Sequence, residues 1–242
     1  MEKNDTKKQK VSGKSAKSLQ ECNLTVDRVR EERLHMLDRA LKKLFPKAGM
    51  ALNYGSHWEL LVAVELSAQC TDKKVNEVTE RLFKKYRTPD EYAHADPVEF
   101  AQDIHSTGFY QNKTKNILAA ARMVTIDFGG ILPRTMAEML RIPGVARKTA
   151  NVVLGNAYGV VEGIAVDTHV KRFAIRYDLS DSRDPVVIER DLMALLPKKD
   201  WFGFTYRVIE YGRQIAPARK YDTTKDPLVQ IYKPAGEVFR VQ

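Results

Sequence analysis

The chain has 242 residues, of which 43% are hydrophobic and two are cysteines, and its formal net charge is +9. This length can form one large domain or two small ones. No apolar run of about eighteen residues and no signal-peptide core are found, so we expect neither a membrane span nor secretion. Two cysteines do not make a disulfide framework and favour a reducing cytoplasm. The positive charge favours a polyanionic partner such as nucleic acid.

The first 23 residues differ in composition from the rest of the chain. They are rich in Lys, Ser and Gln and contain few large apolar side chains. Six lysines stand against Glu2 and Asp5 in residues 1–20, and the rest of the chain is also basic. We expect a flexible basic tail over residues 1–23, which either adds non-specific affinity for phosphate or only keeps the protein soluble.

Helical periodicity dominates the remaining sequence. Apolar residues at helical spacing run from Val29 to Leu44, from Trp58 to Leu66, from Val75 to Phe83 and from Ile117 to Val124, with a short helix opened by Pro97. Further helices are predicted over residues 134–140, 147–158, 168–177, 185–195 and 201–215. Because no sustained strand alternation occurs, the predicted class is all-α, with short loops marked by Pro and Gly.

The stretch from residue 140 to residue 154 is the most informative. One helix is predicted to end near Leu140, a tight turn follows at Pro143 and Gly144, and a second helix begins around Ala146. Such a helix–hairpin–helix pattern exposes backbone N–H groups at the positive end of a helix, where a DNA phosphate can bind. An ordinary corner between two helices has the same pattern, so the turn alone leaves both interpretations open.

Lys148 lies in the first turn of this second helix, next to Arg147. The helix dipole and the neighbouring like charge both disfavour a charged amine, so we expect a lowered pKa for Lys148. Amines of this kind act as nucleophiles and form Schiff bases. The same position would also suit a lysine that only binds phosphate.

Asp167 follows a short apolar run and precedes the helix predicted from Thr168. Aspartate is a natural N-cap at such a position, because its side chain accepts hydrogen bonds from the first backbone N–H groups. A capping Asp that faces a cleft could also stabilise positive charge on a substrate. Both roles are consistent with the sequence.

Several of these stretches, in the same order, resemble the endonuclease III branch of the helix–hairpin–helix DNA glycosylases. Residues 142–153 resemble the hairpin signature of this family, and residues 165–169 resemble its Ala-Val-Asp-Thr-His signature. Residues 59–72 resemble its early helix and the following loop, and residues 107–113 resemble its second DNA-facing loop. The resemblance extends from about Trp58 to Arg219, which is most of the chain after the tail.

The resemblance implies a fold of two helical subdomains that flank a DNA-binding cleft. It implies a six-helix barrel over residues 50–160, with the helix–hairpin–helix motif at about 134–158. Residues 24–49 and 161–242 would together form the terminal helical subdomain.

The resemblance also implies a mechanism, in which Lys148 is the nucleophile and Asp167 the catalytic aspartate. The lesion is flipped out of the duplex, Lys148 attacks the sugar and expels the base, and the Schiff base allows β-elimination. The implied protein is a bifunctional DNA N-glycosylase and abasic-site lyase. It would act as a monomer on double-stranded DNA containing oxidised pyrimidines or abasic sites, in the cytoplasm and associated with the nucleoid. The alternatives are a non-catalytic module that binds damaged or abasic DNA, and mainly an abasic-site lyase.

The DNA contacts are likewise implied by the resemblance. Gln69 would enter the space that the lesion vacates, and Phe109, bulkier than the usual aliphatic residue of the family, would wedge between bases. The backbone of Gly144 and Ala146 would hold a phosphate. The other expected DNA-binding residues are Tyr110, Arg147, Thr149, His169, Arg219 and Lys220. Helix packing would equally explain His169, and solvation would explain Arg219 and Lys220.

One feature of the family is missing from this sequence. The family usually carries a four-iron–four-sulfur cluster, held by four closely spaced cysteines near the C-terminus. Here Ala216 occupies the place of the first cysteine, and no cysteine follows Cys70. Because the cluster needs thiolate ligands, we expect no iron–sulfur cluster, and the scattered histidines indicate no zinc site. The residues expected to hold the C-terminal region by packing instead are Trp201, Phe202, Phe204, Tyr206, Val208, Ile209, Tyr221, Ile231 and Tyr232.

Overall fold

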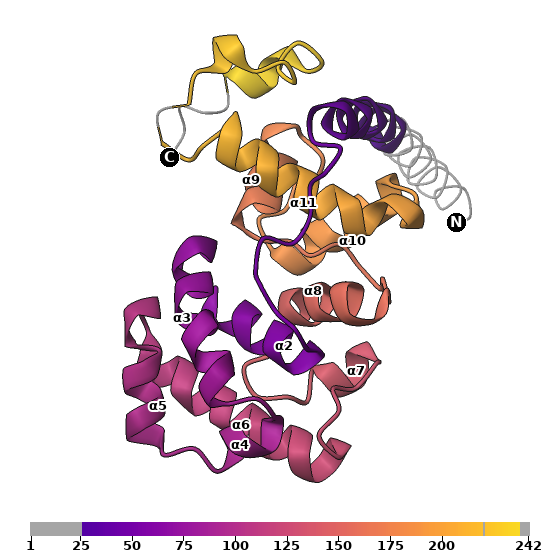
Figure 1. Ribbon diagram of the computed structural model, residues 1–242. Helices are drawn as coiled ribbons and strands as arrows, with labels where there is room; N and C mark the ends of the chain where they lie inside the picture. The colour runs from indigo at the N-terminus through magenta and orange to yellow at the C-terminus, as the bar shows by residue number, and fades with distance from the viewer. Residues whose placement is uncertain (1–25, 220, 238–242) are drawn as a thin grey trace, which may run out of the picture. The chain divides into compact units, whose positions relative to one another are not determined.

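The computed structural model describes residues 26–219 and 221–237, and the regular structure of this part of the chain is entirely helical (Figure 1). The all-α class is thereby confirmed, while the basic tail over residues 1–23 lies outside the described residues. Residues 26–44 are helical, and the further helices are α2 (His57–Leu66), α3 (Asp72–Lys85), α4 (Pro89–Ala93), α5 (Pro97–Asp103), α6 (Tyr110–Phe128), α7 (Met136–Met139), α8 (Arg147–Tyr158), α9 (Thr168–Arg176), α10 (Pro185–Leu195) and α11 (Lys198–Gln214). None of these helices combines the length and the apolar character that crossing a membrane requires.

Helices α8 and α10 have the predicted bounds, but two other helices begin where the sequence gave no apolar signal. No helix is predicted between Phe83 and Pro97, yet Pro89 is the first residue of α4, because the side chain of Thr88 caps this helix. Helix α6 already begins at Tyr110, seven residues before the apolar series that starts at Ile117. Its first turn is largely polar, so periodicity alone could not detect it.

The chain divides into two compact units. The first comprises Met1–Pro46, Thr168–Asp200 and Arg207–Gln242, and the second comprises Lys47–Asp167 and Trp201–Tyr206. This division differs from the expected one, which placed residues 47–49, 161–167 and 201–206 in the terminal subdomain. As a result, Lys148 and Asp167 belong to the same unit.

Helix α2 is the buried centre of the second unit. Eight of its ten residues are buried, and it packs against α3, α6 and α8. A helix that is apolar all round is typically enclosed by other elements, which explains the continuous apolar run of this segment. Helix α8 meets another part of the unit at Gly155, where an added Cβ atom would lie 2.3 Å from Cε2 of Phe202. Only glycine permits this close packing.

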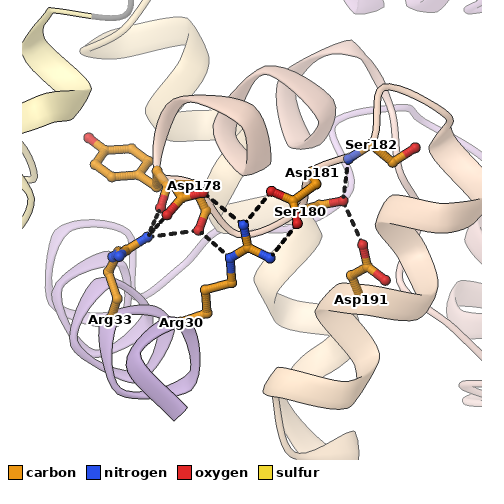
Figure 2. A network of polar contacts seen from close by, with 8 residues as sticks. Arg30, Arg33, Asp178, Ser180, Asp181, Ser182 and Asp191 are labelled. Atoms are coloured by element: carbon orange, nitrogen blue, oxygen red, sulfur yellow. Dashed lines mark hydrogen bonds and ion pairs between the residues drawn. The ribbon is translucent and has the colours of Figure 1, made fainter. Parts of the chain in front are cut away.

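In the first unit, two arginines of the helical residues 26–44 bind the chain that follows α9 (Figure 2). Nη1 of Arg33 donates to the carbonyl oxygens of Tyr177 and Asp178 at 2.8 Å and 2.7 Å. Arg30 bridges the carboxylates of Asp178 and Asp181, with N···O distances of 2.9 Å and 2.6 Å. Because a helix carries partial negative charge at its C-terminus, these cations stabilise the end of α9.

The segment after α11 is tied to the first unit by a buried carboxyl group. Asp226 is 1% exposed, and its Oδ2 accepts hydrogen bonds from the hydroxyls of Tyr211, Tyr221 and Tyr177. The guanidinium of Arg176 lies 4.3 Å from the ring centroid of Tyr221. Burial raises the pKa of all three tyrosines, so their hydroxyls remain protonated donors. We call these five residues the Asp226 cluster.

The expectation for the C-terminal region is therefore only partly right. Tyr221 belongs to the Asp226 cluster, and the ring of Tyr232 lies 4.0 Å from the guanidinium carbon of Arg33. In contrast, Trp201–Tyr206 belongs to the second unit. Asp226 was not predicted, because an acidic residue in a polar stretch gives no sign of burial.

We expect Asp226→Ala to lower the free energy of unfolding of the first unit by about 3 kcal/mol, because it leaves buried tyrosine hydroxyls without their acceptor. Urea unfolding followed by circular dichroism measures this change. The matched control is Asp222→Ala, which removes an exposed cap of the 3₁₀ turn Thr223–Lys225 and should cost about 1 kcal/mol. Equal effects of the two substitutions would contradict a structural role for the Asp226 cluster.

Candidate active site

The helix–hairpin–helix motif of the second unit connects α7 to α8. The N–H of Val145 donates to the carbonyl of Ile142 at 3.1 Å, and Gly144 between them has a φ of +83°. Proline at the second position and a positive φ at the third are typical of a type II turn. Ala146, the N-cap of α8, provides no side-chain hydrogen bond to the helix. The first backbone N–H groups of α8 therefore form the kind of helix terminus that binds anions.

Lys148 is the half-buried second residue of α8. Burial lowers the pKa of its ammonium group, while the carboxylates of Asp167 and Asp72 act in the opposite direction. An ammonium group that loses hydration favours its neutral form, which is the nucleophilic one. The predicted direction of the shift agrees with the structure, but its main cause is burial and not the charge of Arg147.

Asp167 immediately precedes α9, so it occupies the expected N-cap position, and its side chain is half-buried. Its charge also acts on Lys148, which brings the two predicted catalytic residues into one site of the second unit. Asp72, the first residue of α3, is a second carboxylate that acts on this lysine. The sequence gave no reason to select Asp72, because an Asp at the start of a helix is common.

The two loops predicted to probe DNA share an unusual backbone conformation. Gln69 and Phe109 have φ values of +54° and +48°, in the left-handed region that non-glycine residues rarely adopt. Phe109 is 61% exposed, which is high for a large aromatic side chain. A strained backbone that presents such a side chain to solvent indicates a functional position. Tyr110 is half-buried and packs on His105, with ring centroids 4.5 Å apart.

These loops and the hairpin meet at one pocket of the second unit, with a volume of about 250 Å³. Gln69, Phe109, Gly144 and Thr149 all line this pocket. Lys113 joins the two loops, because its Nζ donates to the carbonyls of Leu66 at 2.8 Å and Thr107 at 2.9 Å. The other residues of the lining are Val64, Glu65, Ala68, Asn112 and Asn116.

Comparison with known proteins agrees with this arrangement. Residues 62–198 match the family model described as HhH-GPD superfamily base excision DNA repair protein. The chain belongs to this family. Within the family, it is a member of the endonuclease III branch, as its motifs predicted.

The relatives are similar over most of their length. Endonuclease III from Synechocystis sp. is 51% identical over 180 residues, which cover 74% of this chain and 82% of the relative. Endonuclease III from Bacillus subtilis is 44% identical over 189 residues, which cover 78% and 86%. A non-covalent endonuclease III–DNA complex matches with a TM-score of 0.82 at 39% identity, over 87% of this chain and 98% of that one. A trapped endonuclease III–DNA covalent intermediate matches with the same TM-score and identity, over 87% of this chain and 99% of that one.

Two of the DNA contacts predicted from the endonuclease III resemblance, His169 and Arg219, belong to the first unit and do not line this pocket. A Cβ atom on Gly212 would lie 2.3 Å from Nδ1 of His169, and Nη2 of Arg172 lies 3.2 Å from the same nitrogen. His169 thus packs against α11. Arg219 is exposed, and Lys220 falls outside the described residues. DNA contacts of these three residues remain predictions.

The residues of this chain do not fit the iron–sulfur cluster of the family. That cluster needs four thiolates, whereas the only cysteines in the whole sequence are Cys22 and Cys70. Within residues 26–219 and 221–237, no group of three His, Cys, Asp or Glu side chains could hold a metal ion. Cys70 is a half-buried free thiol.

Glu65 was not predicted as a site residue, although it lines the pocket. Its side chain is 8% exposed, and its Oε1 has no hydrogen-bond partner in the described part of the chain. Burial raises the pKa of this carboxyl group to about 8. An acidic residue inside the apolar run of α2 is the signal that could have identified it.

We expect Glu65→Leu to remove a pH-dependent loss of stability. The folded chain retains this proton up to about pH 8, whereas the unfolded chain releases it near the ordinary pKa of 4.5. Stability therefore falls as the pH rises between these two values and levels off above the higher one. Between about pH 5 and about pH 8, the wild type should lose about 3 kcal/mol relative to the variant in urea unfolding. Glu80→Leu, at an exposed position, is the control, and parallel curves for wild type and Glu65→Leu would contradict this assignment.

Proposed function

We propose that the chain is a bifunctional DNA N-glycosylase and abasic-site lyase that removes oxidised pyrimidines from duplex DNA. The observation that carries this proposal is the half-buried Lys148, whose lowered pKa makes its amine a nucleophile beside Asp167. A module that only binds DNA needs a charged lysine for phosphate, not one whose burial favours the neutral form. The membership of the chain in a family of base excision repair proteins supports the same conclusion.

In the proposed reaction, the neutral amine of Lys148 attacks C1′ of the flipped nucleotide. The bond between C1′ and the base breaks, and its electron pair leaves with the base, which takes up a proton. The carboxylate of Asp167 stabilises the positive charge that develops on the sugar. The attached amine loses a proton and the sugar ring opens to give a Schiff base. Loss of a proton from C2′ then expels the 3′ phosphate, which nicks the strand.

The loops and the hairpin would hold the DNA in position for this step. Gln69 would fill the space that the flipped nucleotide leaves, and Phe109 would wedge between neighbouring bases. The N–H groups of Gly144 and Ala146 would bind a phosphate. Tyr110, Arg147 and Thr149 complete the proposed contacts of the second unit. The protein would work as a monomer on DNA in the nucleoid.

Borohydride reduction of a mixture with DNA containing thymine glycol or an abasic site should trap a covalent complex with the wild type. Lys148→Gln should abolish this complex, because it removes the amine. Since the pKa of Lys148 is lowered, the trapping rate should rise with pH and level off below the ordinary pKa of 10.5. Gel electrophoresis of the products measures adduct and strand cleavage together.

Two further variants complete this experiment. Lys115→Gln, an exposed lysine of α6, is the matched control and should trap DNA as the wild type does. Asp167→Asn should fold and bind DNA but react at least about a hundredfold more slowly. Cleavage by the wild type without any adduct would overturn the Schiff-base mechanism. An adduct with abasic DNA but none with thymine glycol would instead assign the protein as mainly an abasic-site lyase.

We also propose that the protein acts without an iron–sulfur cluster, with the Asp226 cluster fastening the C-terminal segment of the first unit. The absence of cysteines after Cys70 supports this, since thiolates are the ligands of such clusters. Protein purified without oxygen should contain no stoichiometric iron. It should also show no absorption band at about 400 nm, where iron–sulfur charge transfer is expected. It should nevertheless cleave damaged DNA. If each chain contained the four iron atoms of one cluster, and if removing this iron abolished the activity, the proposal would be refuted.

A further inference from the structure

The carboxyl group of Glu65 lies against the hairpin turn. A Cβ atom added to Gly144 would lie 2.9 Å from Oε1 and 3.0 Å from Oε2 of Glu65, and 3.0 Å from Cβ of Asn116. The carboxyl group is therefore in contact with the glycine at the tip of the turn. Both groups also line the pocket that Gln69 and Phe109 share. A change in the charge of the Glu65 carboxyl group therefore acts directly beside the hairpin backbone.

Among residues 26–219 and 221–237, no cation lowers the pKa of Glu65. Lys113 lines the same pocket, but its ammonium group is bound to the carbonyls of Leu66 and Thr107. Other titratable groups on the segments packed against α2 are Cys70 in the loop after α2, Asp72 at the start of α3, Tyr110 and Lys115 on α6, and Arg147 and Lys148 at the start of α8. Burial is the cause of the raised pKa of Glu65, and none of these charged groups contributes to it. The buried carboxyl group therefore favours its neutral form.

We propose that Glu65 is a positioning residue for DNA binding, which supports the hairpin only as a neutral carboxylic acid, so that its ionisation weakens the binding of phosphate at Gly144. This inference rests on the phosphate contact of the hairpin that the proposed function includes. An ionised Glu65 places a negative charge in a poorly solvated position next to the turn that would hold the anionic phosphate. The two charges repel each other, and the ionised carboxylate also draws water towards the packed turn.

The direction of the pH effect follows from linkage. If a bound phosphate disfavours ionisation, then DNA binding raises the pKa of Glu65, and proton loss lowers DNA affinity by the same factor. Full affinity is present below about pH 8 and is lost as the pH rises through that value. A rise of one unit in the pKa on binding corresponds to a tenfold change in affinity.

The test compares wild type with Glu65→Gln, which keeps the shape of the side chain but cannot ionise. Affinity for a duplex containing a tetrahydrofuran abasic analogue, which cannot form a Schiff base, is measured by fluorescence anisotropy from about pH 6 to about pH 9.5 at constant ionic strength. The wild type should lose about tenfold more affinity over this range than Glu65→Gln does. The single-turnover rate at saturating thymine glycol DNA should be unchanged by the substitution, because Glu65 acts on binding. Glu80→Gln on α3 is the matched control and should follow the wild type.

The possible outcomes separate this inference from the proposed function. Failure of the wild type to bind the analogue even at the lowest pH would remove the proposed DNA contact itself. If DNA affinity had the same pH profile in wild type and Glu65→Gln, only the role of Glu65 would be overturned. The same holds if Glu65→Gln lowered the single-turnover rate at saturating DNA but left the affinity unaltered. If Glu65→Gln does not fold, a carbon-13 NMR titration of Glu65 in the wild type decides the question. DNA must raise the pKa of this carboxyl group, and an unchanged pKa would reject the inference.

Discussion

The burial of α2 on all sides is the constraint on which the site of the second unit depends. This helix packs against α8, which carries Lys148, and against α3, which begins at Asp72. Its C-terminal end leads to the loop of Gln69, and Lys113 binds its last carbonyl while also holding the loop before Phe109. One apolar helix therefore fixes the distances between the nucleophile, the two probing loops and the hairpin. The loops can adopt strained conformations because this core holds their ends.

The same burial sets the protonation states of the site. Lys148 and Glu65 are opposite in chemistry, yet loss of hydration shifts both towards their neutral forms. For Lys148 the carboxylates of Asp167 and Asp72 moderate the fall in pKa. Glu65 has no such counter-charge and stays a carboxylic acid. At the hairpin, the backbone N–H groups at the positive end of α8 attract phosphate.

The features of the fold and the site that could be predicted depend on local sequence. The bounds of α8 follow from periodicity and from the Pro-Gly turn, and the pairing of Lys148 with Asp167 follows from two family signatures. The missed features depend on tertiary structure. The first turn of α6 is polar and needs its neighbours to form, and the burial of Asp226 by three tyrosines joins positions up to 49 residues apart. For Lys148 the direction of the pKa shift was accessible from the sequence, but its main cause was not, because burial is a property of the folded unit.

The discontinuity of the first unit has a consequence for how the chain is made. Arg30 reaches Asp178 across 148 residues, and the Asp226 cluster joins α9 and α11 to the segment that follows α11. Domains tend to fold as units while the chain is still being synthesised. Most of the second unit is contiguous and is synthesised early, but the helical residues 26–44 bind residues of the first unit that are synthesised after it. The first unit can therefore form only after α9 and the residues of the Asp226 cluster have been synthesised, whereas most of the second unit can fold before them.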